Sequence, residues 1–529
     1  MNVSKFPYYN TITDVRATLS CFIFCGNMLK TTFSANYNFG NSFIFSNFAP
    51  VNLHVLIMER IIGRETEIAK LTDYQNSGRS EFVAIYGRRR VGKTFLVRSF
   101  FRDKFDFYAT GIIDGSAEEE QEAFHQALVR YGHKGGRAAT WIQAFTQLAD
   151  LLERKNRNRQ RRLVVFIDEL PCFDTKRSGF LHALDLFWNS RASWLDNIYF
   201  VVCGSATSWM MRNIVNNRAG LHKRTTHTLH LRPFSLGQTE EYLVSRKFRW
   251  PRIAILQAYM VLGGIPYYLG ILDPRKNLPD NIDTLFFSQE AELEGEYRRL
   301  FLSLFRNAES YMEILRLLST NRDGYTRIEI ASKLGIADNG ALSDMLDDLE
   351  QCDFLRRYNN GRKQNGGIYQ LIDFFTLFHH HFLVKRITDE HFWRNHLGTP
   401  EQNTWYGLTF ERVCLWHVSQ IVRGLHLDTI AHEYYAWRSR ESSPAVQIDL
   451  IIDRADGICT ICEMKYSKDD YTLTEREYRK IIRRMETFVR ETSHHDGVQV
   501  SIVTTYALHE NMYSEISPIP ITMEQLFMR

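Results

Sequence analysis

The segment Gly87-Arg88-Arg89-Arg90-Val91-Gly92-Lys93-Thr94 has the spacing GxxxxGKT, and it constrains the fold of this 529-residue chain more than any other feature. It follows an apolar run at residues 82–86 and precedes an amphipathic segment at residues 94–101. A glycine-rich turn between a strand and a helix surrounds phosphates with backbone N–H groups. The loop therefore predicts ATP binding through all eight residues, with Lys93 on the outer phosphates and Thr94 on Mg²⁺. A glycine turn with a chance lysine is the alternative, which the strand and helix context disfavours.

Two carboxylates end a second apolar run, at residues 163–169. This run is typical of a buried parallel strand, and its acids follow the loop at a distance that allows one intervening strand and helix. We expect Asp168 to hold Mg²⁺ and Glu169 to polarise the attacking water. Two surface acids closing a strand are the alternative.

Small polar residues follow a third apolar run, at residues 198–203. The carboxyl end of a parallel strand faces the ligand in an open α/β sheet. Ser205 is therefore a candidate to sense the γ-phosphate or to position the water. Serine is also a common turn former, so this role and a turn remain equal alternatives.

Composition is that of an ordinary globular protein, with 44% hydrophobic and 24% charged residues. The length suggests about three or four domains. The net charge of +4 does not by itself indicate a nucleic-acid partner. The eight cysteines lie mostly in apolar runs, and the one close pair, Cys459 and Cys462, has an odd spacing that places its members on opposite faces of a strand. We expect reduced thiols in the cytoplasm and no zinc.

Residues 1–57 differ from the rest of the chain: they carry four formal charges, eight Phe and eight Asn. No run reaches the roughly 18 apolar residues of a transmembrane helix, so no membrane partner is expected. At Met58 the sequence changes to a charged pattern that is compatible with a helix. We interpret residues 1–57 as an unstructured or mispredicted extension. A cleaved presequence is the alternative.

Periodicity divides the remainder into modules. Residues 58–235 alternate apolar strands with helical stretches, which predicts a P-loop NTPase core with a parallel sheet and helices on both faces. The expected strands are 82–86, 106–111, 163–168, 198–204 and 228–234, with helices at 117–131 and 141–154. Residues 236–305 lack strand signals and are predicted to form a helical lid. The basic run at residues 154–162 favours a solvated loop over a nucleic-acid contact, since no aromatic residue is interleaved.

Residues 306–375 suggest a winged helix, with helices at 311–318, 327–334 and 340–351 and a hairpin pairing 354–358 with 368–372. Its third helix carries acids and no basic residue, namely Asp344, Asp347, Asp348 and Glu350. Phosphates repel such a helix, so a protein, intramolecular or self-association contact is expected in place of base reading. Arg356, Arg357, Arg362 and Lys363 in the wing leave weak backbone contact open.

The C-terminal module, residues 376–529, holds a second group of acids. Strands at 447–453 and 457–465 carry Asp449, Glu463 and Lys465, and the last two share one face because they are two residues apart. Two carboxylates can hold Mg²⁺ while a lysine activates the water that attacks a phosphodiester. Glu411, on an upstream helix, is a further candidate metal ligand.

A positively charged helix at residues 475–490 supports this interpretation of a nuclease site, because it offers a track for a phosphate backbone. Its basic residues are Arg476, Arg479, Lys480, Arg483 and Arg484. A solvated hairpin with alternating charges produces the same strand pattern and remains the alternative.

Residues 58–235 resemble the archaeal-type ATPases, which are related to the AAA+ and STAND groups. The resemblance rests on Gly63-Arg64-Glu65, the loop at 84–94, Phe166-Ile167-Asp168-Glu169-Leu170-Pro171 and Cys203-Gly204-Ser205. In the lid, Gly263-Gly264-Ile265-Pro266-Tyr267-Tyr268-Leu269 is similar to the GxP element that STAND proteins place against adenine. The resemblance implies Arg64 and Pro266 in the adenine pocket and Arg224 as an arginine finger or sensor.

The C-terminal module resembles the PD-(D/E)xK restriction-endonuclease-like domains through Asp449, Glu463 and Lys465. The proline that usually precedes the first acid is replaced by Ile448. The resemblance implies an α/β nuclease-like fold. Two functions follow as alternatives: an ATPase coupled to a nuclease-like domain acting on DNA, or a STAND-type switch whose last domain binds a partner or DNA without cleavage.

Overall fold

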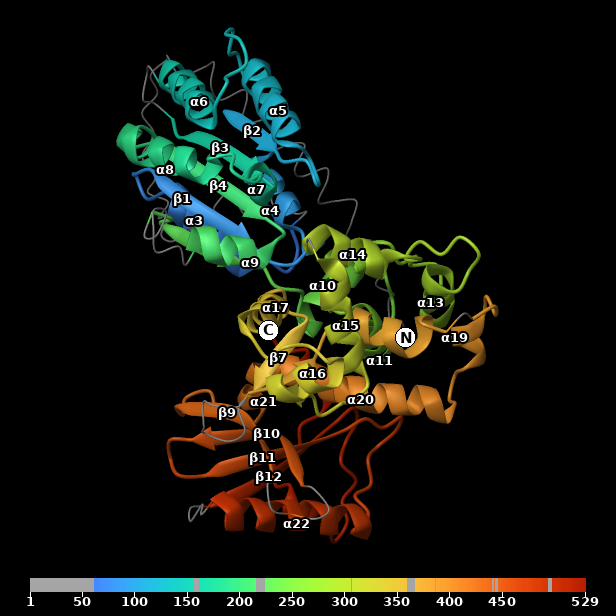
Figure 1. Ribbon diagram of the computed structural model, residues 1–529. Helices are drawn as coiled ribbons and strands as arrows, with labels where there is room; N and C mark the ends of the chain where they lie inside the picture. The colour runs from blue at the N-terminus through green and yellow to red at the C-terminus, as the bar shows by residue number, and fades with distance from the viewer. Residues whose placement is uncertain are drawn as a thin grey trace, which may run out of the picture. The chain divides into compact units, whose positions relative to one another are not determined.

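A five-stranded parallel sheet organises the N-terminal part of the computed structural model, which describes residues 61–156, 161–215, 224–305, 307–358, 367–385, 387–439, 442, 446–492 and 497–529. The strand order is β2-β3-β4-β1-β5. The strands are β1 (Glu81–Tyr86), β2 (Phe107–Thr110), β3 (Leu163–Asp168), β4 (Ile198–Gly204) and β5 (His227–His230) (Figure 1). The interpretation of residues 1–57 lies outside the described residues.

Strand β5 is shorter than the predicted strand at 228–234. The backbone N–H of Leu231 still bonds the Tyr86 carbonyl oxygen at 2.7 Å, and Pro233 follows two residues later. Proline has no N–H to donate to a neighbouring strand, so regular pairing ends there.

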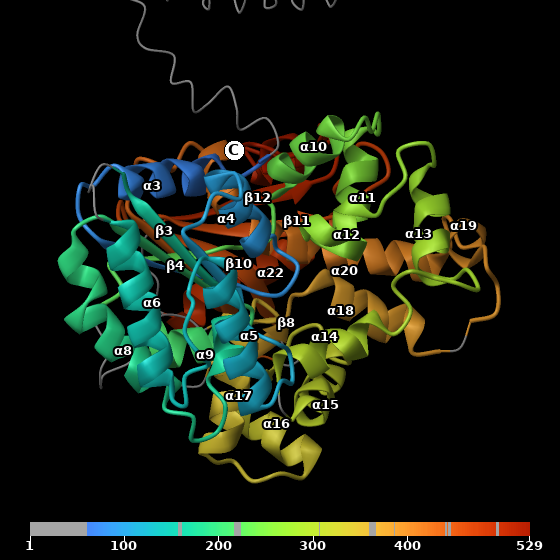
Figure 2. The same cartoon turned by 90° about the horizontal axis from the view of Figure 1, so that it is seen from above.

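Alternate residues of β1 divide the core into two faces. Phe82 and Ala84 pack in one cluster with α5 (Ala117–Arg130), α6 (Trp141–Lys155) and α8 (Phe180–Ser190). Val83 and Ile85 pack in the other, with α3 (Glu65–Gln75) and α4 (Lys93–Phe101). The period of two along a strand produces this division. Figure 2 shows β3 and β4 between α3 and α4 on one side and α6 and α8 on the other. Short helices complete this part: α7 (Leu170–Phe173), η1 (Ala192–Leu195), α9 (Thr207–Met210) and η2 (Met211–Val215).

The predicted lid is helical throughout its described residues. Its helices are α10 (Leu236–Ser245), α11 (Arg252–Leu262), α12 (Pro266–Gly270), α13 (Leu278–Phe286) and α14 (Glu296–Leu304). Ser235 and Asn277 cap the N-termini of α10 and α13, because each side chain accepts a hydrogen bond from a backbone N–H of the first turn.

The next module contains the three helices and the hairpin expected between residues 306 and 375. They are α15 (Ala308–Ser319), α16 (Arg327–Leu334), α17 (Gly340–Gln351), β7 (Leu355–Tyr358) and β8 (Ile368–Leu371). A short strand, β6 (Tyr325–Thr326), pairs with the other side of β8. Residues 359–366, which include Arg362 and Lys363 of the expected wing, lie outside the described residues.

A four-stranded sheet of order β12-β11-β10-β9 forms the last module (Figure 1). Its strands are β9 (His432–Arg438), β10 (Gln447–Arg454), β11 (Cys459–Lys465) and β12 (Val498–Thr504). The predicted pair β10 and β11 is antiparallel, and β11 runs parallel to β12. The surrounding helices are α18 (Phe374–Phe378), η3 (His379–Leu383), α19 (Phe392–Asn395), α20 (Pro400–Trp416), α21 (Val418–Gly424), α22 (Glu475–Thr492), η4 (Ser514–Ile516) and α23 (Met523–Leu526).

Residues 58–529 form one packing unit, although the sequence divides them into modules. One apolar cluster contains Ile61, lid residues such as Leu256, the α15 residue Leu315 and, near the end of the chain, Phe527. The final residues also contact the lid, where Arg529 forms an ion pair with Glu241. The modules therefore share a core. Among the described helices, none combines the length and the apolar character needed to cross a membrane.

Candidate nucleotide site and candidate acidic site

The loop between β1 and α4 has the backbone shape that its glycines allow. Gly87 has φ +146°, and a Cβ there would lie 2.2 Å from the Leu231 carbonyl oxygen. Gly92 has φ +91° and caps α4. The Lys93 ammonium donates to the carbonyl oxygens of Gly87 and Arg88 at 2.8 and 3.0 Å. A side chain at Gly87 would collide with the backbone, and the positive φ at both positions favours glycine. The loop thus forms a cradle that phosphates would approach, and its carbonyl oxygens hold the Lys93 ammonium.

Asp168 lies beside the hydroxyl predicted to bind the metal. Thr94 Oγ1 donates to Asp168 Oδ2 at 2.8 Å, which joins the start of α4 to the end of β3. Burial raises the pKa of Asp168 to about 6, and the Thr94 hydrogen bond opposes that rise. A carboxylate and a hydroxyl at this spacing are suitable ligands for Mg²⁺, whose charge would return the carboxyl to its ionised form.

Glu169 is held by the residue that follows the neighbouring strand. Its carboxylate accepts from the Ser205 backbone N–H at 3.1 Å and from the Ser205 hydroxyl at 2.6 Å. Glu169 also has φ +45°, a strained value for a residue other than glycine, and such strain concentrates at functional positions. Ser205 therefore contacts the predicted water-polarising acid, and its role in sensing phosphate stays a prediction.

A cavity of about 450 Å³ opens beside the loop. Arg64 and Pro266 line it, as the resemblance implies. The Arg64 guanidinium is 5% exposed, donates to the Val91 carbonyl oxygen at 3.1 Å and lies over the Phe234 ring. Burial lowers its pKa to about 10. Other apolar and aromatic side chains, which the sequence did not single out, line the part of the cavity where an adenine ring would lie: Ile61, Ile62, Phe234, Tyr242 and Tyr267. The remaining loop residues on this wall are Arg89, Arg90, Val91, Gly92, Lys93 and Thr94.

The side chains of Arg88 and Arg90 both form ion pairs with carboxylates of other modules. Arg88 is buried, forms an ion pair with Asp373 and lies over the Phe354 ring. Because the Arg88 side chain is directed to the module after the lid, the predicted contact of Arg88 with phosphate rests on its backbone N–H and stays a prediction. Arg90 pairs with Glu296 of α14 at 2.8 Å while also lining the cavity. Both arginines tie the phosphate loop to elements more than 200 residues away.

Arg224 is not brought to the phosphate loop of its own chain. It is exposed and precedes β5, whose first residue, His227, pairs with Val83 near the start of β1. The loop leaves β1 at the opposite end, after Tyr86. The structure thus places Arg224 away from the phosphate loop of its own chain, and its role as a finger or sensor stays a prediction.

The acidic α17 contacts the ATPase sheet region. Asp348 accepts from Arg212 at 3.0 Å and from the Tyr311 hydroxyl at 2.7 Å. At the end of β5, His230 lies 3.4 Å from Asp353. Within the described chain, Asp348 of this helix and Asp353, just after it, thus serve intramolecular contacts.

In the last module, Glu463 and Lys465 share one face of β11, as their spacing predicts. Lys465 Nζ is 2.7 Å from Glu463 Oε1, and Arg484 of α22 contacts Glu463 Oε2. Burial raises the pKa of Glu463, but the two cations outweigh burial and the net shift is downward. Asp449 lies on the neighbouring strand one residue from Leu450, which pairs with Cys462.

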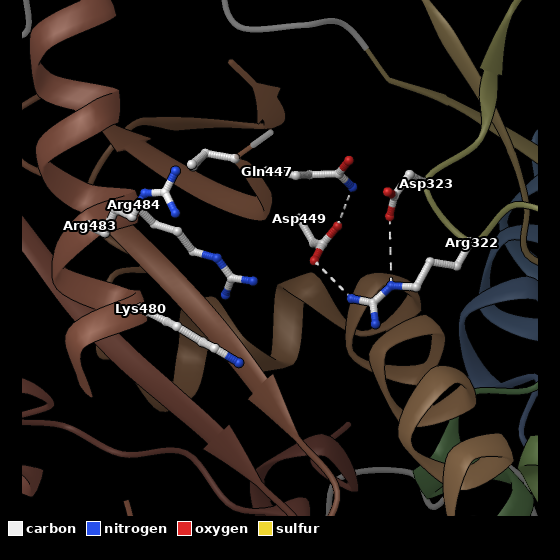
Figure 3. A pocket seen from close by; sticks show the side chains of 8 residues that line it. Arg322, Asp323, Gln447, Asp449, Lys480, Arg483 and Arg484 are labelled. Atoms are coloured by element: carbon white, nitrogen blue, oxygen red, sulfur yellow. Dashed lines mark hydrogen bonds and ion pairs between the residues drawn. The ribbon is translucent and has the colours of Figure 1, made fainter. Parts of the chain in front are cut away.

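Glu411 and Asp449 converge on a cation that the sequence did not reveal. Arg322 follows α15, and its guanidinium lies 3.0 Å from Glu411 Oε2 and 3.9 Å from Asp449 Oδ2. Figure 3 shows the contact with Asp449. Arg412 pairs with the other oxygen of Glu411 at 2.8 Å. Burial, with the nearby Asp449 charge, raises the pKa of Glu411 to about 7. The described residues contain no cluster of three or more metal-ligating side chains, so Glu411, Asp449 and Glu463 are not assembled around one ion here.

A second cavity, of about 400 Å³, lies beside Asp449 and is mostly basic. Figure 3 shows Lys480, Arg483 and Arg484 of α22 on one side of it and Arg322 on the other. No periodicity of the sequence links Arg322 to this site. The only signal is its place in the loop between two helices, which does not distinguish it from a solvated arginine.

Comparison with known proteins agrees with the geometry of the first site. Residues 61–272 match the model of an ATPase domain found predominantly in Archaea. This part of the chain is a P-loop ATPase domain. The match ends after α12, so the ATPase domain includes Arg64, the phosphate loop, Asp168, Glu169 and Pro266.

Proteins that match a larger part of this chain share 23% sequence identity or less with it. The uncharacterized protein MJECL04 of Methanocaldococcus jannaschii is 23% identical over 434 residues, which is 80% of this chain and 90% of that protein. The Walker-type ATPase PABY2304 of Pyrococcus abyssi has a TM-score of 0.41 and 18% identity, covering 60% of this chain and 95% of its own. Cdc6p from Pyrobaculum aerophilum has a TM-score of 0.31 and 15% identity, with coverages of 63% and 95%.

Proposed function

We propose that this ATPase uses its nucleotide state to control a nuclease-like site in the C-terminal module, and that the substrate of that site is DNA. The observation that carries the proposal is the placement of Asp449, Glu463 and Lys465 on adjacent strands beside a basic cavity. Carboxylates are the ligands that Mg²⁺ prefers, and arginine and lysine side chains are the usual partners of phosphate oxygens.

The nucleotide site supplies the first half of the mechanism. Main-chain N–H groups of residues 87–94 and Lys93 would hold the phosphates, and Thr94 with Asp168 would hold Mg²⁺, which neutralises charge on the phosphates when bound. Glu169 would accept a hydrogen bond from the attacking water. Ser205 keeps the Glu169 carboxylate in place through two hydrogen bonds, so the base needs no reorganisation when nucleotide arrives.

Two ion pairs support communication between the modules. Arg88 pairs with Asp373, and Arg90 pairs with Glu296, so the phosphate loop also holds one residue of the lid and one of the module after it. A phosphate that attracts the Arg90 guanidinium, which lines the nucleotide cavity, would compete with Glu296 for it. Nucleotide binding thereby has a direct route to the elements between the ATPase domain and the last sheet.

The test is a nuclease assay on the full chain with Mg²⁺ or Mn²⁺ and ATP, using single- and double-stranded DNA and RNA. We expect cleavage of DNA by the wild type, loss with Lys465→Ala, and loss of the ATP dependence with Lys93→Ala. Lys468→Ala, an exposed lysine three residues further on, is the matched control and should cleave normally. Intact nucleic acid under every condition would contradict the nuclease proposal.

A STAND-type switch is the second candidate, and the neutralised acids favour it. Glu411, Asp449 and Glu463 each lie next to an arginine or lysine, which is an arrangement suited to a binding surface without cleavage. In this case Glu169→Gln should hold the ATP-bound conformation, and limited proteolysis should differ between the ATP and ADP states. Identical proteolysis patterns in the two states would count against the switch.

A further inference from the structure

Arg322 has an unusual position, because its side chain comes from one module and ends among the acids of another. It lies between α15 and β6, whereas Glu411 belongs to α20 and Asp449 to β10. One guanidinium nitrogen, Nη2, lies 3.0 Å from Glu411 Oε2 and 3.9 Å from Asp449 Oδ2. A single nitrogen atom of Arg322 is thus close to both carboxylates.

The backbone of Arg322 is held by two buried side chains, whereas its own side chain is about half exposed. Its carbonyl oxygen accepts from Gln370 Nε2 and from Arg412, both of which are buried. The side chain is 55% exposed, whereas those of Glu411 and Asp449 are 8% and 16% exposed. Arg322 can therefore swing out by rotating side-chain torsions, without unfolding either module.

We propose that Arg322 is a built-in blocking cation, which occupies the metal position between Glu411 and Asp449 until it withdraws. The inference rests on the proposed nuclease-like site and adds a regulatory step to it. A divalent ion held by these acids would face the guanidinium at close range, and like charges repel strongly in a partly buried site. Metal binding and the Arg322 contact therefore exclude each other.

A phosphodiester bound in the neighbouring cavity would be an alternative partner for the withdrawn Arg322 side chain. Arg322 lines the same cavity as Lys480 and Arg484, which face it from α22 (Figure 3). A phosphodiester bound there would attract the guanidinium by charge-assisted hydrogen bonds. Nucleic acid in the cavity would then draw Arg322 away from the acids and free them for metal. Cleavage chemistry would be restricted to the substrate-bound state.

The test measures Mn²⁺ binding to the full chain by titration calorimetry, without nucleotide or DNA, so that no turnover is needed. We expect Arg322→Gln to bind Mn²⁺ about fivefold to tenfold more tightly than the wild type, as removal of one competing cation predicts. Arg322→Lys should stay close to the wild type because it retains the charge. Arg316→Gln, an exposed arginine of α15, is the control for loss of a surface charge and should have no effect.

A second substitution assigns the binding to this site. Asp449→Asn in the Arg322→Gln background should remove the added affinity. If wild type and Arg322→Gln bind Mn²⁺ equally and both lose it with Asp449→Asn, the blocking role is overturned and the metal site stands. If none of these variants binds Mn²⁺ in a manner that Asp449 affects, the nuclease-like metal site itself fails, and the blocking role with it. Thermal unfolding of each variant verifies that the fold is intact.

Discussion

The two acidic sites of this chain differ in the groups that hold their carboxylates. In the ATPase domain, Asp168 and Glu169 are held by the hydroxyls of Thr94 and Ser205. In the last module, the closest groups to Glu411 and Glu463 are guanidinium and ammonium ions. A hydroxyl orients a carboxylate and leaves its charge available, whereas a cation cancels that charge.

This difference separates a site that is ready for its ligand from one that must open first. The nucleotide site combines ionisable acids, a glycine cradle and a cavity of about 450 Å³. The last module has the acids and a basic cavity, but its carboxylates already have cationic partners. The same residue types thus support catalysis in one environment and neutralisation in the other.

The largest expected effect concerns the base of the first site. Glu169→Gln should lower ATP turnover by about 10² to 10⁴-fold, because the amide cannot take a proton from water. ATP affinity should be retained, since Glu169 is not a phosphate ligand in this account. Steady-state phosphate release and nucleotide titration measure the two quantities. Glu118→Gln, an exposed glutamate of α5, should behave as wild type; unchanged turnover in Glu169→Gln would remove Glu169 from the mechanism.

A second prediction concerns the connection between the two sites. Arg88→Ala should lower the free energy of unfolding by about 3–5 kcal/mol, because it leaves the buried Asp373 carboxylate without its partner. The side chains of this pair are 3% and 4% exposed. Arg98→Ala breaks the exposed pair with Asp103 and should cost less than about 1 kcal/mol in the same urea titration. Equal losses in both variants would show that Arg88 does not join the loop to Asp373.

Ser205→Ala sharpens the statement that hydroxyls position the acids. Loss of the 2.6 Å hydrogen bond to Glu169 should lower kcat by about tenfold and leave the KM for ATP unchanged. Ser190→Ala, an exposed serine of α8, is the control. A rise in KM at constant kcat would instead assign Ser205 to phosphate binding.

The smallest effect is a pH dependence of metal binding at the nucleotide site. Burial raises the pKa of Asp168 to about 6, so its carboxyl takes up a proton as the pH falls through that value and then no longer binds Mg²⁺. The Mg²⁺ concentration for half-maximal turnover should be about fourfold higher at pH 5.5 than at pH 7.5, after correction for protonation of ATP. A constant requirement for Mg²⁺ across this range would contradict the assignment of Asp168 to the metal.

Local patterns predicted most of the elements and the nucleotide site. The GxxxxGKT spacing and the acids after β3 specify their own environment, because strand, loop and helix are adjacent in the sequence. The period of two also placed Glu463 and Lys465 together on β11. These are short-range relations, which a sequence expresses directly.

Long-range contacts were not predictable in this way. Arg322 and Glu411 are 89 positions apart, Arg88 and Asp373 285, and no periodicity connects either pair. The position of Arg224, before β5 and at the opposite end of the sheet from the phosphate loop, is a further relation that its motif context did not reveal. Partners brought together by packing of modules require the structure.

The most direct test of the account is calorimetric titration of the full chain with ATP, in the presence of Mg²⁺ and of a chelator, alongside Lys93→Ala. The account predicts one ATP per chain and weaker ATP binding without Mg²⁺. In Lys93→Ala the affinity for ATP should be at least about a hundredfold lower, because the bound phosphates lose their cationic partner. Lys104→Ala, an exposed lysine after α4, should bind as wild type. No heat of association for folded wild-type protein, or equal affinity in Lys93→Ala, would contradict it.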